Sequence, residues 1–233
     1  MSASTDYFLR HEVTRKAKRF LNSVGVPVSV DGAVQSARKG QLDYLEQLDI
    51  AEIDLGETNA EGVSPLLAAI QEKDAAVIDY LLIRQDVVEK IDQRPMAFQH
   101  NPMSFALANK DYAVAKRLHS FGADASVEKE PGLPFLISAV KNRDSEMVDF
   151  LLDHGVDVND QGTYPASALA LAADHDDLKL MDRIIDAGGD PDGKGRSMEP
   201  LLIESALLGQ YDEVGLLIEK GADIAIESMG KTL

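Results

Sequence analysis

The sequence predicts an all-α protein built as a solenoid, a linear array of stacked helix pairs. Glycines recur every 33 residues at Gly122, Gly155, Gly188 and Gly221, and leucine or isoleucine precedes each of them. A fixed period in this range is typical of stacked supersecondary units. The composition, 45% hydrophobic and 27% charged, is that of a folded protein, and the absence of tryptophan indicates an aliphatic core.

The period extends through most of the chain when the units are aligned on one internal position. These alignment positions are Gly40, Lys73, Lys110, Arg143, Asp176 and Gly209. Four residues earlier, every unit has a small residue: Ser36, Ala69, Ala106, Ala139, Ala172 and Ser205. Eight residues later, every unit has a large aliphatic one: Leu48, Leu81, Leu118, Leu151, Ile184 and Leu217. This pattern predicts two antiparallel helices per unit, with small residues allowing close approach and aliphatic ones filling the seams.

Two segments resemble the opening of an ankyrin repeat, which reads Thr-Pro-Leu-His-x-Ala-Ala. They are Ser64-Pro65-Leu66-Leu67-Ala68-Ala69-Ile70 and Ala168-Leu169-Ala170-Leu171-Ala172-Ala173. The Gly-Ala-Asp after a leucine doublet resembles the end of the same repeat. The resemblance covers about residues 31–226 as six degenerate repeats. No unit keeps the histidine of the opening motif, and the first has Glu52 where the closing glycine belongs.

Residues 1–30 are expected to form an N-terminal capping helix. Within residues 4–24, apolar side chains at helical spacing define one face, and basic side chains lie on the other. The apolar face consists of Phe8, Val13, Ala17, Phe20 and Leu21. A basic amphipathic helix also suits a membrane or a partner. We favour the cap, because the acidic array that follows offers this helix a complementary surface.

The repeat domain is expected to span residues 31–226. Its units are placed at about 31–58, 59–91, 92–127, 128–159, 160–192 and 193–226, and residues 227–233 resemble the start of an incomplete further repeat. One unit has four extra residues, which predicts a longer hairpin or loop over residues 86–101. This loop is either a functional element or a place where Met96 and Phe98 fold back over a hydrophobic gap.

The net charge of −17 is unevenly distributed. Residues 1–30 hold five basic and two acidic side chains, a net +3, which leaves −20 for the remainder. Such a field disfavours nucleic acid and anionic membranes and attracts a cationic protein partner. Acidity that only maintains solubility explains the charge equally well. The chain has no cysteine, and its first residues lack the apolar core of a signal peptide, so we expect a cytoplasmic protein.

No motif predicts catalysis, a metal or a cofactor. The Gly230-Lys231-Thr232 sequence resembles a phosphate-binding loop, but Glu227 would repel the phosphate. The stretch 190–195 resembles a calcium loop, but Lys194 and Leu201 occupy positions that need oxygen ligands. The five histidines lie in different units without ligand spacing. We therefore expect a non-enzymatic protein.

The family resemblance implies that a partner binds the concave face, formed by loop tips and the exposed ends of the first helices. The aromatic residues at two loop tips, Phe98 and Tyr164, are typical interface anchors. Alignment places Arg38, Leu207 and Leu208 at such helix ends. The candidate partner-binding residues are Glu61, Gln71, Glu72, Phe98, His100, Asn109, Lys141, Asn142, Tyr164, Asp174, His175 and Arg196.

The sequence thus predicts a non-catalytic, monomeric scaffold that binds another protein, with a basic partner as the leading refinement. The alternative is a regulatory ankyrin module of a larger enzyme or of a secreted bacterial effector.

Overall fold

The computed structural model describes residues 3–93 and 100–225, with side chains from Leu9 onward. Several features of interest in the sequence lie outside these residues. They are the side chain of Phe8, the loop residues Met96 and Phe98, and the C-terminal stretch 227–233 with its phosphate-loop resemblance.

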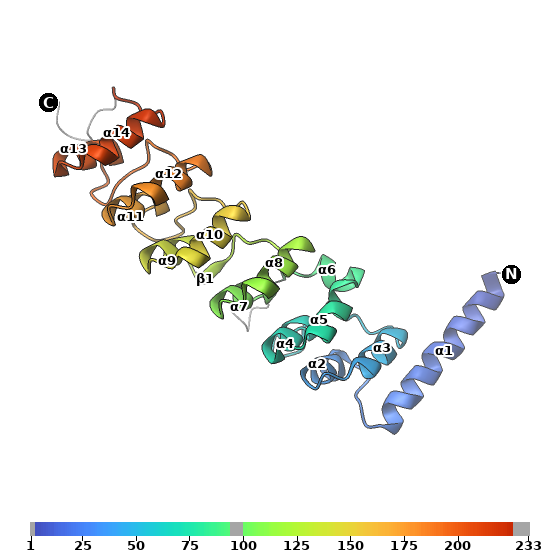
Figure 1. Cartoon of the computed structure of the whole chain (residues 1–233). Coiled ribbons are helices and arrows are strands. Elements are labelled where there is room, and N and C mark those ends of the chain that lie inside the picture. The colour runs from blue at the N-terminus through green and yellow to red at the C-terminus, as the bar shows by residue number, and fades with distance from the viewer. Residues whose placement is uncertain (1–2, 94–99, 226–233) are drawn as a thin grey trace. The chain divides into compact units, whose positions relative to one another are not determined.

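The described residues form fourteen α-helices and two short strands, which confirms the predicted all-α class (Figure 1). The helices are α1 Ala3–Ser23, α2 Val30–Arg38, α3 Leu42–Ile50, α4 Pro65–Glu72, α5 Ala75–Leu82, α6 Gln85–Glu89, α7 Pro102–Ala108, α8 Tyr112–Ser120, α9 Phe135–Lys141, α10 Ser145–Asp153, α11 Ala168–Asp174, α12 Leu178–Asp186, α13 Leu201–Leu208 and α14 Tyr211–Glu219. The strands β1 Glu128–Glu130 and β2 Leu133–Pro134 pair antiparallel.

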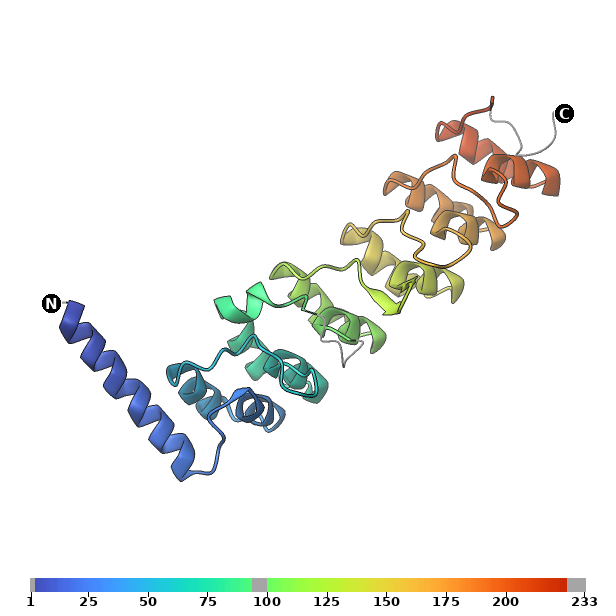
Figure 2. The same ribbon diagram turned by 180° about the vertical axis from the view of Figure 1, so that it is seen from behind.

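The chain divides into two compact units, Met1–Asp124 and Ala125–Leu233. In unit 1, α4 packs between α2 and α7, while α3 contacts both α1 and α5. In unit 2, the first helices α9, α11 and α13 lie on one side, and the second helices α10, α12 and α14 lie on the other (Figures 1 and 2). The six repeat boundaries given above remain a proposal.

Side-chain caps explain where most of these helices begin. The first helix of a pair is opened by Ser64, Asn101 or Ser167, whose side chain accepts a hydrogen bond from the backbone N–H three residues later. The second helix is opened by an aspartate immediately after the alignment position. These aspartates are Asp74, Asp111, Asp144 and Asp177. Side-chain caps therefore define both helix starts in three of the six pairs.

The alignment positions form the turn between the two helices of each pair. All six have positive backbone φ angles, from 54° to 76°. Only Gly40 and Gly209 are glycines, and the other four positions are occupied by lysine, arginine or aspartate. A side chain in this left-handed region costs about 1 kcal/mol. Most pairs therefore tolerate local strain at the turn.

The two predicted core rows are buried. The small residues four positions before each turn are at most 3% exposed, and the aliphatic residues eight positions after it are at most 1% exposed. The core is aliphatic, as the composition predicts. Burial thus follows the sequence period in both units.

The predicted opening helix is confirmed as α1, but its apolar face is divided. Thr14, Ala17 and Leu21 are buried, and α1 contacts α3. Val13 and Phe20, expected on the same face, are 51% and 44% exposed. The expectation was wrong for these two because the predicted stripe is wider than the surface one neighbouring helix covers.

The segment expected as a loop over residues 86–101 begins within a helix. Helix α6 runs from Gln85 to Glu89. Asp86 accepts a hydrogen bond from the backbone N–H of Leu55 at 2.8 Å, and the Lys90 ammonium contacts Asp54 at 2.5 Å and Glu57 at 2.7 Å. These contacts connect α6 and the residue that follows it to residues 54–57, in the loop after α3.

Candidate partner-binding surface

Five of the twelve predicted partner-binding residues take part in contacts between the end of a first helix and the next loop. In unit 2, the Lys141 ammonium lies 5.1 Å from the centre of the Tyr164 ring. One repeat later, Arg196 Nε lies 2.5 Å from Asp174 Oδ2. In unit 1, Arg38 lies 3.9 Å from Glu61. The sequence separations are 22 or 23 residues, so the repeat itself creates these contacts.

We call Lys141, Tyr164, Asp174, His175 and Arg196 the helix-end surface of unit 2. Lys141 and Asp174 are the last residues of α9 and α11, and His175 follows directly as the C-cap of α11. Helices α9 and α11 pack side by side. The Lys141–Tyr164 pair and the Asp174–Arg196 pair therefore lie on neighbouring repeats. The surface combines an amphipathic aromatic ring with charged groups of both signs.

The loop that carries Arg196 is held by Glu204 of α13. Glu204 Oε2 accepts hydrogen bonds from the Ser197 hydroxyl at 2.8 Å and from the Ser197 backbone N–H at 3.2 Å. Gly195 permits this approach, because a Cβ atom there would collide with the Glu204 carboxylate. The Arg196 side chain therefore extends from a fixed backbone.

Opposing effects act on the pKa of the Asp174 carboxyl. Burial raises the pKa of the Asp174 carboxyl above its ordinary value, Arg196 lowers it, and the negative charge of Glu204 raises it further. The raised pKa indicates that Arg196 does not fully compensate for the lost hydration. A cationic group of a partner would therefore stabilise the ionised form of this carboxylate.

Two exposed leucines, which the repeat alignment also places at the end of a first helix, continue this surface. Leu207 and Leu208 are 76% and 68% exposed at the end of α13. In the repeat alignment they correspond to Asp174 and His175. Large exposed aliphatic side chains in a row of polar residues are typical of contact sites. In the sequence, their position in the repeat alignment indicates that they belong to this surface.

The remaining predicted residues of unit 1 are placed separately. Gln71 is half-buried and Glu72 is exposed at the end of α4. His100 is half-buried, with its ring edge-on to Phe105 at a centroid distance of 6.4 Å. Phe98, the other predicted anchor, lies outside the described residues.

Asn109 and Asn142 are engaged with their own helices. Asn109 Nδ2 donates to the Phe105 carbonyl oxygen at 2.9 Å, and Asn142 Nδ2 donates to the Ser138 carbonyl oxygen at 2.8 Å. Both asparagines are helix C-caps. A partner that bound either amide would have to compete with these hydrogen bonds.

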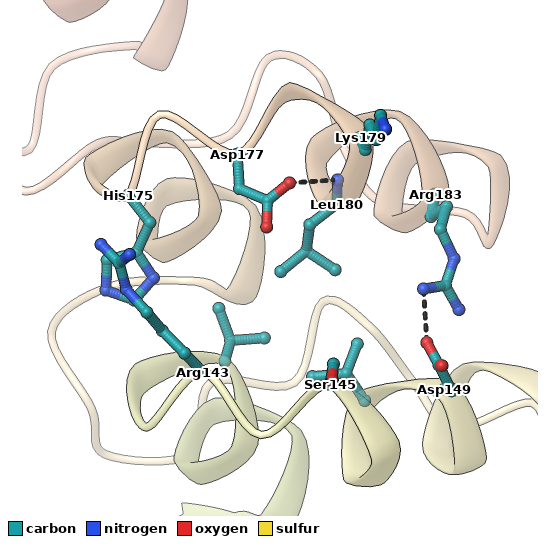
Figure 3. A pocket seen from close by; sticks show the side chains of 10 residues that line it. Arg143, Ser145, Asp149, His175, Asp177, Lys179, Leu180 and Arg183 are labelled. Atoms are coloured by element: carbon teal, nitrogen blue, oxygen red, sulfur yellow. Dashed lines mark hydrogen bonds and ion pairs between the residues drawn. The ribbon is translucent and has the colours of Figure 1, made fainter.

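Unit 2 also has a pocket of about 270 Å³ that the sequence did not reveal (Figure 3). It is lined by Val140, Arg143, Ser145, Val148, Asp149, His175, Asp177, Lys179, Leu180 and Arg183. Asp177 caps α12 by accepting from the Leu180 backbone N–H at 3.0 Å, and Asp149 pairs with Arg183 at 2.5 Å. Its basic residues lie up to 40 positions apart, which hides the cluster in the sequence.

The calcium-like stretch is a structural turn. Asp190 Oδ1 accepts from the Asp192 backbone N–H at 3.0 Å, and Asp192 Oδ1 accepts from the Asp223 backbone N–H at 2.7 Å. Asn159 accepts in the same way from Asp190, at 2.9 Å. These bonds link successive loops. Among residues 9–93 and 100–225, no group of three or more histidine, aspartate or glutamate side chains is placed to hold a metal ion.

No helix in the described part of the chain has the length and apolar character needed to cross a membrane.

Comparisons with known proteins agree with this architecture. The family model for ankyrin repeats in three copies matches residues 103–194 and 136–228. No curated protein matches the sequence. An ankyrin repeat domain from Acinetobacter baumannii is 19% identical with a TM-score of 0.59, and the alignment covers 82% of this chain and 98% of that one.

A second similar structure is that of a predatory endopeptidase from Bdellovibrio bacteriovorus in complex with an immunity protein. The matching chain is 21% identical with a TM-score of 0.52, and the alignment covers 81% of this chain and 97% of that chain. Identities this low show a shared fold. Together the two family matches span residues 103–228, more than half of the sequence. The chain therefore belongs to the ankyrin repeat family.

Proposed function

We propose that this chain is a non-catalytic, monomeric scaffold of the cytoplasm that binds a partner protein through the helix-end surface of unit 2. Ankyrin repeats generally mediate protein–protein interaction, and the fold is typically a non-catalytic module. The observation that carries the proposal is the row of cross-repeat pairs, Lys141 with Tyr164 and Arg196 with Asp174, beside exposed Leu207. Tyrosine and arginine side chains on a fixed backbone make good anchors, and the exposed leucine adds apolar contact area beside them.

We further propose that the partner is basic. Residues 125–233 contain 22 acidic and nine basic side chains, a net charge of −13. Charge of this density accelerates encounter with a cationic protein and disfavours acidic ones. Asp174, with its incompletely compensated carboxylate, lies within the surface that such a partner would contact.

The similarity to a chain from an endopeptidase–immunity protein complex makes an enzyme a reasonable class of partner to examine. Binding at the helix-end surface would then restrain or escort that enzyme. The support for an enzyme as the partner is limited to this similarity of fold.

The test is affinity capture from native lysate with wild-type protein and two variants that leave the net charge unchanged. Tyr164→Ala removes the aromatic ring that Lys141 contacts, whereas Tyr211→Ala makes the same truncation at an exposed position of α14. We expect the first variant to lose the partner and the second to retain it, because only Tyr164 belongs to the helix-end surface. Crosslinking from position 164 should then identify the bound segment.

Salt completes the test. Raising the ionic strength from about 0.05 M to about 0.5 M should release a basic partner. Capture that is equal for Tyr164→Ala and the wild type would exclude the helix-end surface. Capture that is insensitive to salt would exclude charge steering. A chain that captures no protein would favour the regulatory-module alternative.

A further inference from the structure

Unit 1 has a groove between α1 and α3 that lies outside the helix-end surface. Its apolar lining comes from Val13, Ala17 and Phe20 of α1 and Ile50 of α3, and its volume is about 540 Å³. Val13, Phe20 and Ile50 are 51%, 44% and 38% exposed. These are large hydrophobic side chains on two neighbouring helices. We call this feature the α1–α3 groove.

The apolar surface extends along α1 beyond the groove. Leu9 is 55% exposed and lies four residues before Val13, on the same side of the helix. The buried stripe of α1, with Ala17 and Leu21, already satisfies the contact with α3. Within the second stripe, Phe20 contacts the Tyr44 ring of α3 at a centroid distance of 6.1 Å, but Leu9, Val13 and Phe20 all remain more than 40% exposed. A continuous apolar patch of this kind marks an interaction site.

The two walls of the groove carry different charges. On the α1 wall, Lys16 pairs with Glu12 at 3.1 Å. On the α3 wall, Asp43 and Glu46 line the groove. Within the described residues, neither of these two carboxylates has an ion pair. The α3 wall therefore offers uncompensated negative charge directly beside the apolar floor.

We propose that the α1–α3 groove docks an amphipathic α-helix of a partner protein, with lysine or arginine along the edge that faces Asp43 and Glu46. Two adjacent helices with exposed side-chain ridges form a groove into which the ridges of a third helix fit. The apolar stripe of that helix covers Val13, Phe20 and Ile50. This docking site is independent of the surface proposed in unit 2.

Charge distinguishes this occupant from an anionic bilayer. A membrane in contact with Val13 and Phe20 would bring its phosphates close to Asp43 and Glu46, which opposes binding. A helix with one basic edge meets the same carboxylates favourably.

The experiment uses a fluorescein-labelled peptide of about 18 residues, long enough for five helical turns. It has a leucine stripe, lysines along one edge and glutamates along the other, and its binding to the full chain is measured by fluorescence anisotropy. Ile50→Asp and Val13→Asp should each weaken binding by about tenfold or more, because each places a charge against the leucine stripe. Both residues are exposed, so the fold should persist.

Three controls make the result specific. Leu208→Asp places the same charge on an exposed leucine of unit 2 and should change the dissociation constant by less than about twofold. Glu46→Lys should weaken binding of this peptide and strengthen binding of a version with both edges acidic. A peptide with a central proline, which cannot form the helix, should not bind.

The proposal is overturned if the helical peptide does not bind at roughly 100 µM, or if Ile50→Asp binds it as well as the wild type. It is also overturned if sedimentation shows a dimer that Val13→Asp abolishes, since a second copy would then occupy the groove. Vesicles of phosphatidylcholine and phosphatidylserine that bind the wild type but not Val13→Asp would assign the groove to a membrane.

Discussion

The two compact units use the same repeat but complete their cores differently. In unit 1, α4 packs between two first helices, and all six residues from Pro65 to Ile70 are buried. In unit 2, α9 and α11 each bury six consecutive residues in the same way, but α13 buries Leu201, Leu202 and Ser205, while Leu207 and Leu208 are exposed. Similar hydrophobic sequences therefore reach different burial. The neighbouring helices decide how much of each pattern contributes to stability.

The units also differ in charge. Residues 1–124 contain 18 acidic and 14 basic side chains, a net −4, compared with −13 for residues 125–233. Ion pairs between successive repeats occur in both, for example Arg117 with Asp79 and Arg183 with Asp149. Exposed pairs contribute little, about 0–1 kcal/mol each. Buried side chains therefore contribute more to stability than these exposed ion pairs do. Repulsion between like charges costs more stability in unit 2 than in unit 1, because unit 2 has the larger net negative charge.

Truncation of a seam leucine should have the largest effect and should test burial in each unit. Leu81→Ala in unit 1 and Leu151→Ala in unit 2 each remove a side chain that is at most 1% exposed. Each should lower the free energy of unfolding by about 2–5 kcal/mol, measured by urea denaturation with far-UV circular dichroism. Leu207→Ala, at an exposed leucine, should change it by less than about 0.5 kcal/mol. A cost below about 1 kcal/mol for Leu151→Ala would contradict its assignment to the seam.

A glycine in unit 2 should rank next. Gly162 has a φ of 56°, and a Cβ atom there would collide with the carbonyl oxygen of Gly132, which accepts from the Thr163 backbone N–H at 2.8 Å. Gly162→Ala should therefore cost about 2–3 kcal/mol. Gly155→Ala is the matched control, because its φ is 67° but the space around its Cβ is open. It should cost about 1 kcal/mol. Equal costs would show that the loop-to-loop contact contributes nothing.

The repeat period predicted the core of both units because burial at a seam repeats with the sequence. The small residue before each turn and the aliphatic residue eight positions after it occupy the core in all six pairs. The period could not predict the burial of side chains on a helix that packs against a single neighbouring helix. Val13 and Phe20 are exposed because α1 contacts α3 with a narrower stripe than its apolar residues span.

The same limit applies to the candidate surface. Alignment selected Lys141, Tyr164, Asp174 and Arg196 as separate positions. The structure shows that Lys141 contacts Tyr164 and that Asp174 contacts Arg196. Alignment could not show that Asn142 would donate to its own helix, because that depends on a side-chain rotamer. Nor could it predict left-handed turns at lysine and arginine, for which glycine is the usual residue.

Those turns provide a prediction of smaller magnitude. Lys73 has a φ of 58° at the turn between α4 and α5, where the first pair of unit 1 and the last pair of unit 2 have glycine. Lys73→Gly should stabilise the protein by about 0.5 kcal/mol, because relief of strain exceeds the added entropy of the unfolded chain. Lys39→Gly, at a residue with a φ of −97°, is the control and should destabilise. Urea denaturation measures both, and a loss of stability in Lys73→Gly would show that the turn is not strained.

The smallest expected effect is a pH dependence at Glu213, a buried carboxyl in α14 where earlier pairs have residues such as Val77 and Met147. Burial raises its pKa above the ordinary 4.5, although the Ser205 hydroxyl donates to it at 3.0 Å and opposes the shift.

A carboxyl with a raised pKa binds its proton more tightly in the folded state. Its contribution to stability is complete below the unfolded pKa and is lost as the pH rises through the folded pKa. Glu213→Gln has no proton to lose, so its stability relative to the wild type should increase from about pH 4 to about pH 7. Chemical denaturation at several pH values measures this difference, and Glu219→Gln, at an exposed position of the same helix, controls for net charge. A difference that stays constant with pH would mean that the hydrogen bond from Ser205 offsets the burial of Glu213, and that the last helix pair of unit 2 accommodates a charge where unit 1 buries valine.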